Sequence, residues 1–241
     1  MSHTSGHCSL GRLGNQFIRN LAVSLVAEKN DLNVKYCNNH LFDKLGIHLF
    51  SGTNDYDTIK DLTDENYLCI YNNQVNFNLN PNKAFFQTKE ITNLIYEYLN
   101  NNKKSIIEKN PFKSRYTKNN DLFIHIRLTD AKDKNPGINY YLNAIKNIQF
   151  ENLYIATDEK THDIIKTIFS LYPAKLVECD EITTFQFGST CKHIILSHGS
   201  FSAVIGYLSF FSTVYYPEFK QDKIWHGDIF SIEKWNKLTY T

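Results

Sequence analysis

The sequence predicts an α/β fold made of two Rossmann-type lobes, of which the N-terminal one is abbreviated. In the C-terminal half, short apolar segments typical of strands alternate with segments of helical periodicity, as in parallel βαβ units. A shorter copy of the same alternation begins near the N-terminus. A length of 241 residues accommodates one large domain or two small lobes, and the two separate series of elements favour two lobes.

The C-terminal half shows the clearest alternation of elements. Strands are expected at residues 122–128, 152–157, 174–179, 193–198 and 213–217. Helices are expected at residues 139–148, 159–172, 183–191 and 200–212. The second of these helices carries an apolar stripe that we expect to face the core, made of Ile164, Ile165, Ile168, Phe169 and Leu171. The whole series has the size of a Rossmann lobe.

The N-terminal half predicts a similar but shorter series. A strand is expected at residues 6–10, a helix at 15–30 and a second strand at 33–37. Farther along, residues 88–110 have helical character, and the polar segment 113–121 is interpreted as the hinge between the lobes. The predicted lobes are therefore residues 1–118 and residues 119–241.

Charge and cysteine content narrow the classes of function. With 26 basic and 25 acidic residues and a formal net charge of +1, the chain lacks the electrostatic footprint of a general nucleic-acid binder. Its five cysteines are scattered and never form a Cys-x-x-Cys spacing, so we predict neither a disulfide framework nor a zinc ribbon, and a reducing compartment is the default. No apolar run reaches the about 18 to 20 residues that span a bilayer. We therefore expect a cytoplasmic or otherwise soluble protein without an integral membrane segment.

The first segment that points to chemistry is "SLGRLGNQF", residues 9–17, at the start of the first long helix. Gly11 and Gly14 allow a tight turn and the close approach of a ligand to the backbone. The N–H groups at the helix start suit a phosphate or a sugar hydroxyl. The spacing matches neither the dinucleotide nor the phosphate-loop glycine pattern. The alternative is a strand-to-helix turn in which the glycines serve conformation only.

The second segment is "FIHIRLTD", residues 123–130, at the end of the first strand of the C-terminal lobe. Strand alternation places His125 and Arg127 on one face, and open α/β sheets bind ligands at this end of their strands. The planar fork of Arg127 suits a diphosphate, and Asp130 could orient that guanidinium or take part in proton transfer. The alternative is an arginine–aspartate pair that braces a loop beside a core histidine.

The third segment is "CKHIILSHGSFSAVIGYLS", residues 191–209, where an apolar strand ends and a helix begins near Ser200. Ser200 and Ser202 are good helix caps and could donate hydrogen bonds to a phosphate. Phe201 or Tyr207 could flank a base or a sugar ring. Simple helix capping is the alternative.

Together the three segments resemble those of the α-1,2-fucosyltransferase-like glycosyltransferases, family eleven of the sugar transferases, and more distantly the protein O-fucosyltransferases. The segment "GRLGNQF" is similar to their G-G-L-G-N-Q opening, and His125, Arg127 and Asp130 match an H-x-R-x-x-D block. The segment "HGSFSAV" loosely matches a late N-S-T-F-S-W-W block. Order and spacing agree over most of the chain.

The resemblance implies a GT-B-like fold, in which two Rossmann-type lobes face a crevice. The N-terminal lobe would serve the glycan acceptor, and the C-terminal lobe would hold a nucleotide-sugar donor for inverting transfer without a metal or another cofactor. The catalytic residues implied are Arg127, which would neutralise the diphosphate, and Asp130. The donor-binding residues implied are Gly11, Arg12, Gly14, Asn15, His125, Arg127, His198, Gly199, Ser200, Phe201 and Ser202. The identity of the general base is left open among Asp130, His7 and Asp133.

Departures from the family blocks leave the donor open. Leu128 replaces a second arginine, His198 stands where asparagine is usual, and Ala203 and Val204 replace a tryptophan pair. GDP-fucose is the first expectation and a UDP-sugar such as UDP-xylose is the alternative. A hypothesis of another class is a non-catalytic glycan-binding module of the same fold, and a nucleotide-binding dehydrogenase is a weaker third. The lack of a leader in the given sequence suggests a bacterial or viral origin or a shortened chain.

An acidic pair elsewhere in the chain superficially fits the Asp-x-Asp metal site of other sugar transferases. Asp55 and Asp57 lie in the polar segment "GTNDYDTIKD" with no strand before them. We interpret this segment as a solvated turn rather than a metal site.

Overall fold

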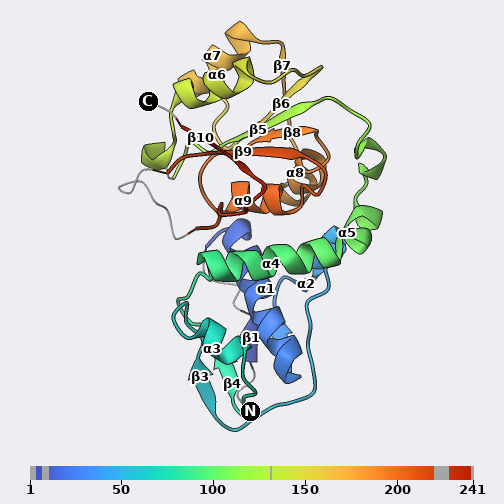
Figure 1. Ribbon diagram of the computed structural model, residues 1–241, viewed down its shortest axis with the longest axis vertical. Coiled ribbons are helices and arrows are strands. Elements are labelled where there is room, and N and C mark those ends of the chain that lie inside the picture. The colour runs from blue at the N-terminus through green and yellow to red at the C-terminus, as the bar shows by residue number, and fades with distance from the viewer. Residues whose placement is uncertain (1–3, 7–10, 131, 220–227, 240–241) are drawn as a thin grey trace. The chain divides into compact units, whose positions relative to one another are not determined.

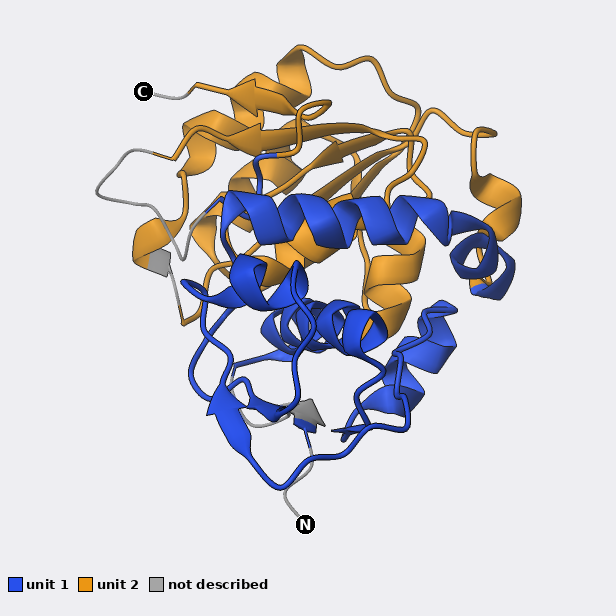
Figure 2. Cartoon of the chain, turned by 60° about the horizontal axis from the view of Figure 1, so that its bottom comes forward, with its two compact units in different colours: residues 1–109, 226–231 blue, residues 110–225, 232–241 orange. Residues whose placement is uncertain are grey.

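The computed structural model describes residues 4–6, 11–130, 132–219 and 228–239. The chain divides into two compact units, which Figure 2 colours separately. Unit 1 comprises residues 1–109 and 226–231, and unit 2 comprises residues 110–225 and 232–241.

The division falls earlier than the predicted boundary after residue 118, because the predicted hinge is bound to unit 2. The side chain of Asn110 donates a hydrogen bond to the carbonyl of Gln186 (2.9 Å), and that of Asn119 donates to the carbonyl of Thr190 (2.9 Å). Arg115 lies 2.7 Å from the carboxylate of Asp121 in an ion pair. These bonds make residues 110–121 part of unit 2 rather than a free linker.

Unit 2 is built on a six-stranded parallel sheet in the order β10-β9-β8-β5-β6-β7. The strands are β5 (Leu122–Ile126), β6 (Leu153–Thr157), β7 (Ala174–Leu176), β8 (His193–Ile195), β9 (Thr213–Pro217) and β10 (Asn236–Leu238). Counted from β5 as the first strand, this is the Rossmann order 3-2-1-4-5-6, whose switch point lies between the first and fourth strands. The predicted α/β class is confirmed, and β10 is a strand that the sequence pattern missed.

Helices cover both faces of this sheet (Figure 1). The helices α6 (Ile138–Lys146) and α7 (Asp163–Leu171) pack on the face that carries Ile124 and Ile126. On the other face, Phe123 contacts Phe187 of α8 (Glu181–Gly188) and His125 contacts Phe201 of α9 (Ser200–Tyr207). The predicted alternation along β5 is therefore confirmed. Two short 3-10 helices span Lys113–Arg115 and Lys132–Lys134.

The apolar stripe predicted for α7 is only partly buried. Ile165 and Ile168 belong to the core, whereas Phe169 is 38% and Leu171 58% exposed. Because α7 connects β6 to the edge strand β7, only the side of the helix that faces the sheet is covered. The prediction that all five stripe residues face the core is wrong at these two positions.

Unit 1 contains a long helix and two short parallel strand pairs, so its sheet is abbreviated as expected. Its helices are α1 (Leu13–Asn30), α2 (Asn39–Leu45), α3 (Tyr67–Tyr71), α4 (Lys89–Asn101) and α5 (Lys103–Lys109). Its strand pairs are β1 (Thr4–Gly6) with β2 (Val34–Tyr36) and β3 (Ile59–Asp61) with β4 (Asn78–Asn80). The helix predicted at 88–110 is two helices that meet at Asn102. Most of the strand predicted at 6–10 lies outside the described residues.

The helix α1 is the core of unit 1. Phe17, Leu21 and Leu25, which are spaced four residues apart in the helix predicted at 15–30, are all buried. Arg19 is also fully buried, and its guanidinium donates to the carbonyl oxygens of Ala84 and Asn82. A buried arginine needs such partners, because an unpaired charge in the interior is costly. This contact joins α1 to the segment that leads into α4.

The cysteines differ from expectation at one position. Cys69, Cys179 and Cys191 are free, but Cys37 is disulfide-bonded. Cysteine pairing depends on distance in the fold rather than on spacing in the sequence, so the scattered pattern did not reveal the bond.

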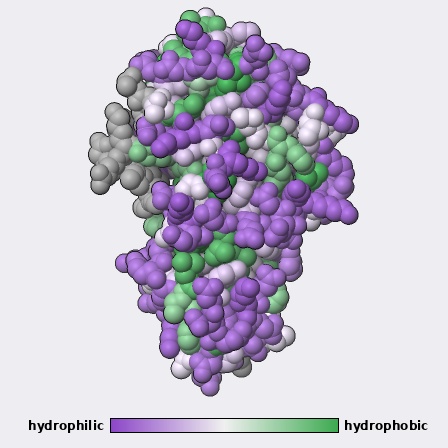
Figure 3. Space-filling view, in the orientation of Figure 1, coloured by the Kyte–Doolittle hydropathy of each residue, from purple (hydrophilic) through white to green (hydrophobic). Residues whose placement is uncertain are grey.

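The surface carries scattered rather than continuous apolar groups. The large apolar side chains described as exposed are Ile59, Leu68, Phe169, Leu171 and Phe211. On the face shown in Figure 3, hydrophilic residues predominate and the hydrophobic ones form small separate areas. Among the helices that the structure describes, none combines the length and apolar character needed to cross a bilayer.

Candidate functional site

The candidate site lies at the switch point of the unit 2 sheet, where β5 and β8 end side by side. Arg127 follows directly after β5, and the segment Leu196–Gly199 joins β8 to α9. The backbone N–H of Arg127 donates to the Ser197 hydroxyl across this point (3.5 Å). The carboxyl ends of strands at a switch point are the usual place for ligands in open α/β sheets.

Arg127 and Asp130 form a two-bond ion pair. The Arg127 Nε donates to Asp130 Oδ1 (3.0 Å) and a terminal nitrogen donates to Oδ2 (2.8 Å). The arginine side chain is 12% exposed, whereas that of Asp130 is 43% exposed. Paired contacts of this kind fix the plane of the guanidinium. The structure therefore brings the two predicted catalytic residues together, with Asp130 as the group that orients Arg127.

Gly199 brings the start of α9 against Arg127. It caps α9 with a φ of +86°, and an ideal Cβ at this position would lie 2.5 Å from a terminal nitrogen of Arg127. The first N–H groups of a helix have no acceptor within the helix and carry a partial positive charge. Ser200 and Phe201 supply such groups here. A cation and a helix N-terminus thus meet at the switch point, an arrangement suited to a phosphate.

His125 lies beneath this site rather than at its surface. It is buried, its Nδ1 is 2.5 Å from the Ser202 hydroxyl, and its ring is 4.9 Å from that of Phe201. The Ser202 hydroxyl also accepts the backbone N–H of Ser197 (3.0 Å). Burial lowers the pKa of His125 to about 3, against the opposite effect of Asp158. At neutral pH His125 is uncharged and joins β5 to the first turn of α9.

A buried hydrogen-bond network that sequence reasoning missed supports the same segment. The Ser197 hydroxyl accepts from Tyr141 (2.9 Å) and lies 3.2 Å from Nδ1 of the buried His198. Asn135 donates to the Tyr141 hydroxyl (3.0 Å) and to the carbonyl of Arg127 (2.9 Å). No sequence motif marks Tyr141 or Asn135, because their roles depend on where α6 and its preceding loop pack.

Asp158, at the end of β6, is a further residue that the sequence analysis did not single out. Its carboxylate accepts from the N–H of Leu128 (2.7 Å) and from the hydroxyl (2.6 Å) and N–H (3.4 Å) of Thr129. Partial burial opposes ionisation, but the hydrogen bonds from Thr129 and Leu128 prevail and lower the pKa of Asp158. A signal was available in the segment "LYIATDE", residues 153–159, where an acidic residue directly follows the strand that neighbours β5. Asp158 fixes the chain between Arg127 and Asp130.

The glycine segment forms the start of α1 in unit 1. Gly11 has a φ of +78°, and a Cβ there would clash with the side chain of Asn15. The carbonyl of Gly11 accepts from Gln16 (2.9 Å), while Asn15 accepts from the buried Gln87 (2.9 Å). Arg12 is exposed, and Gly14 is buried in the first turn of the helix. Gln87 is a supporting residue that the sequence analysis did not single out, and His7 lies outside the described residues.

Comparison with solved structures finds a likeness in fold. In fold, the chain is similar to a fucosyltransferase. The match is to a structure described as NodZ alpha-1,6-fucosyltransferase co-crystallized with GDP, with a TM-score of 0.50 and 9% sequence identity. It covers 88% of this chain and 91% of the other. No protein-family model matches the sequence, and neither does any curated protein sequence. At 9% identity, the likeness to this fucosyltransferase concerns the fold.

The part of the chain with described coordinates contains no group of three or more His, Cys, Asp or Glu side chains placed to hold a metal ion. The Asp-x-Asp segment at Asp55 and Asp57 is an exposed loop, as predicted. The carboxylate of Asp55 accepts a hydrogen bond from Asn78 (2.8 Å), so this contact holds the loop beside β4.

Proposed function

We propose that the chain transfers a sugar from a nucleoside-diphosphate donor, GDP-fucose in the first place, to a hydroxyl group of a glycan. One observation carries the proposal: Asp130 holds the Arg127 guanidinium beside Gly199 and the start of α9. This arrangement offers two kinds of positive group to one anion. The likeness in fold to a fucosyltransferase crystallised with GDP supports the same choice of ligand.

In the proposed reaction, the bond between the anomeric carbon and the diphosphate oxygen breaks, and its electron pair leaves with the nucleoside diphosphate. Arg127 and the N–H groups of Ser200 and Phe201 stabilise the charge that develops on the leaving oxygen. The acceptor oxygen forms the new bond from the opposite face of the sugar, so the anomeric configuration inverts. Protein cations serve the role that a metal ion has in other sugar transferases.

The acceptor hydroxyl must lose its proton during this transfer, and a carboxylate can accept it. Asp130 is exposed enough to reach substrate, although both of its oxygens also accept from Arg127. Asp133 is 69% exposed and paired only loosely with Lys134 (3.4 Å). We propose Asp130 as the base for the acceptor hydroxyl, which approaches the anomeric carbon from the face opposite the diphosphate.

A thermal-shift experiment tests the proposal. The wild type, Arg127→Ala and the surface control Lys166→Ala are heated with GDP, UDP, GDP-fucose or UDP-xylose, once in the presence of EDTA and once with added Mg²⁺. A ligand that binds only the folded state raises its apparent stability. We expect a shift with GDP and GDP-fucose in the wild type and the control, and none in Arg127→Ala.

Other outcomes separate the alternatives. A shift with UDP and UDP-xylose alone would keep the site and change the donor. A shift that requires divalent metal would contradict the metal-independent mechanism. The absence of any nucleotide shift would overturn the transferase proposal and favour the glycan-binding module. Transfer of labelled fucose to a mixture of glycans then distinguishes an enzyme from a protein that merely binds the nucleotide.

A further inference from the structure

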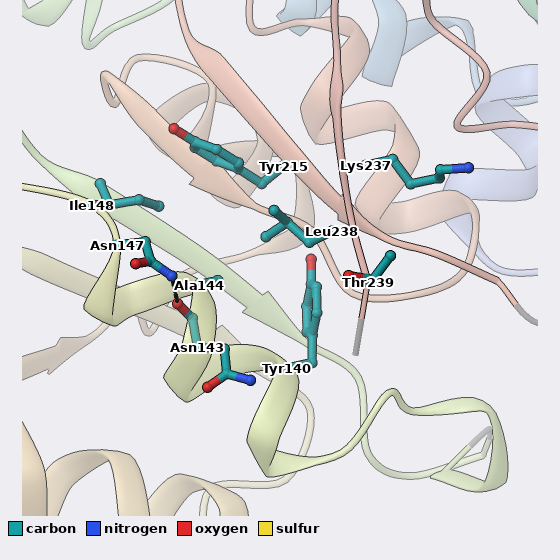
Figure 4. A pocket seen from close by; sticks show the side chains of 9 residues that line it. All are labelled: Tyr140, Asn143, Ala144, Asn147, Ile148, Tyr215, Lys237, Leu238 and Thr239. Atoms are coloured by element: carbon teal, nitrogen blue, oxygen red, sulfur yellow. Dashed lines mark hydrogen bonds between the residues drawn. The ribbon is translucent and has the colours of Figure 1, made fainter. Parts of the chain in front are cut away.

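A cavity in unit 2 lies between α6 and the strands β9 and β10, and none of the residues proposed above to bind the diphosphate line it (Figure 4). Its volume is about 380 Å³. Sites for small molecules range from about 300 to 1,000 Å³, so the cavity is large enough for a small ligand.

One wall of the cavity is an amide edge on α6. Asn143 and Asn147 are one helical turn apart and both are exposed. The Nδ2 of Asn147 donates to the backbone carbonyl of Asn143 (2.8 Å). The Asn143 side chain makes no hydrogen bond to any other described residue. Each amide offers both a donor and an acceptor, which is the combination that neighbouring hydroxyl groups require.

The remaining walls are aromatic and aliphatic. Figure 4 shows Tyr215 of β9 and Tyr140 of α6 on either side of Leu238 of β10. Tyr140 is buried and donates its hydroxyl hydrogen to the carbonyl of Leu196 (2.8 Å), which fixes its ring. Tyr215 is only half-buried, and its hydroxyl is unbonded to the described part of the chain. Burial raises the pKa of Tyr215, so the phenol remains a donor at neutral pH.

The described lining offers no unpaired charge to recruit an anion. Among the described lining residues the cation is Lys237, which is exposed and lies 3.3 Å from the carboxylate of Glu218. In Figure 4 the Lys237 side chain points away from the tyrosines. The residues described along the cavity include no carboxylate. A phosphate or an acidic sugar would therefore find no unpaired cation here.

We propose that this cavity binds a neutral saccharide. The two amides would bond to its hydroxyl groups, and the ring of the half-buried Tyr215 would cover its apolar face. Tyr140 also connects the cavity to the site at the switch point, since Leu196 directly precedes Ser197 and His198. That the saccharide is part of the acceptor glycan rests on the proposed function, whereas binding itself rests on the lining alone.

The test uses the full chain on a printed array of neutral and acidic oligosaccharides, followed by saturation-transfer NMR titration of the best neutral binder. We expect Asn143→Ala and Tyr215→Ala to weaken its binding about tenfold, as for the loss of one or two hydrogen bonds or a ring contact. Gln149→Ala removes an exposed amide two residues beyond Asn147 and outside the cavity lining, so it should bind like the wild type. Asn143 is exposed on a helix, so its variant folds even where Tyr215→Ala does not.

Arg127→Ala separates this proposal from the proposed function. We expect it to lose the GDP thermal shift and to keep saccharide binding. Three outcomes would overturn the saccharide site. They are binding of acidic oligosaccharides alone, no binding to the array, and an affinity of Asn143→Ala for the neutral saccharide equal to that of the wild type. Saccharide binding without any nucleotide shift in the wild type would overturn the transferase proposal and leave the saccharide site standing.

Discussion

Arg127 occupies the space in which a side chain at Gly199 would begin. An ideal Cβ on Gly199 would lie 2.5 Å from a terminal nitrogen of Arg127, a distance that real Cβ contacts do not show. The absence of a side chain thus lets the guanidinium lie against the start of α9. Glycine is favoured here by its φ of +86°, and a side chain at this position would displace the end of the Arg127 side chain.

We expect Gly199→Ala to remove the nucleotide shift and to lower the free energy of unfolding by about 1–3 kcal/mol. Gly137→Ala is the matched control, because Gly137 also caps a helix with a positive φ of +88° but has no atom within 4 Å of an added Cβ. It should cost stability through its φ alone and leave GDP binding unchanged. Urea unfolding and thermal shift measure the two effects. Equal GDP shifts in both variants would show that Arg127 does not depend on the open space at Gly199.

Asp158→Ala tests whether the end of β6 positions the catalytic segment. The substitution removes an acceptor from the N–H groups of Leu128 and Thr129, so we expect a loss of about 1–2 kcal/mol in unfolding free energy and weaker GDP binding. Glu159→Ala is the neighbouring control, because its carboxylate accepts from Thr161 and not from Leu128 or Thr129. A positioning role also predicts that Asp158→Asn, which keeps one acceptor oxygen, recovers part of the GDP shift. Unchanged GDP binding in Asp158→Ala would contradict the role.

The pH dependence of Asp158 has a definite sign. Its pKa in the folded state lies below the ordinary value of 3.8. The stability it contributes is therefore fully present above 3.8 and is lost as the pH falls through the lower folded pKa. In Asp158→Asn this acid-dependent loss should be smaller than in the wild type. Urea unfolding between neutral pH and pH values below 3.8 measures the difference.

The burial of His125 predicts a second range of pH over which the free energy of unfolding changes. Its folded pKa of about 3 lies below the ordinary 6.5 because it is buried. The unfolded chain therefore binds a proton that the folded chain does not, and stability falls as the pH falls from 6.5 toward 3. The slope from this one group is at most about 1.4 kcal/mol per pH unit. His125→Asn should be less stable at neutral pH but show a shallower decline. The exposed His40→Gln serves as the control, and an unchanged slope in His125→Asn would contradict the prediction.

The contact between Gln87 and Asn15 is predicted to couple the glycine segment to the residues before α4. Because the two side chains share one hydrogen bond of 2.9 Å, their alanine variants should be non-additive in unfolding free energy by about 1 kcal/mol. A double-mutant cycle by urea unfolding measures this coupling. The control cycle replaces the exposed Gln74 together with Asn15. These two side chains do not share this bond, so their effects on the unfolding free energy should be additive. Additive effects for Gln87 and Asn15 would show that the bond contributes no net stability.

The sequence by itself determined the class of fold and the ends of the strands that carry the candidate site. Period-two alternation in β5 was enough to assign its two faces, because successive strand side chains point to opposite sides. Helical periodicity likewise located α1, although residues 17–27 are buried on every side of that helix and not on one face alone. The predicted pairing of Arg127 with Asp130 also holds, because the two residues are close in the chain and need little tertiary structure to meet.

Only the tertiary structure decided which residues support the Arg127–Asp130 pair. Asp158, Tyr141 and Asn135 reach the site from other strands, helices and loops, and nothing in their local sequence indicates where those elements pack. The disulfide of Cys37 and the exposure of Phe169 likewise depend on how distant elements pack. Periodicity reports which residues share a face of an element. Whether that face is covered, and which distant residue contacts it, depends on long-range packing, and that packing puts Gly199 beside Arg127.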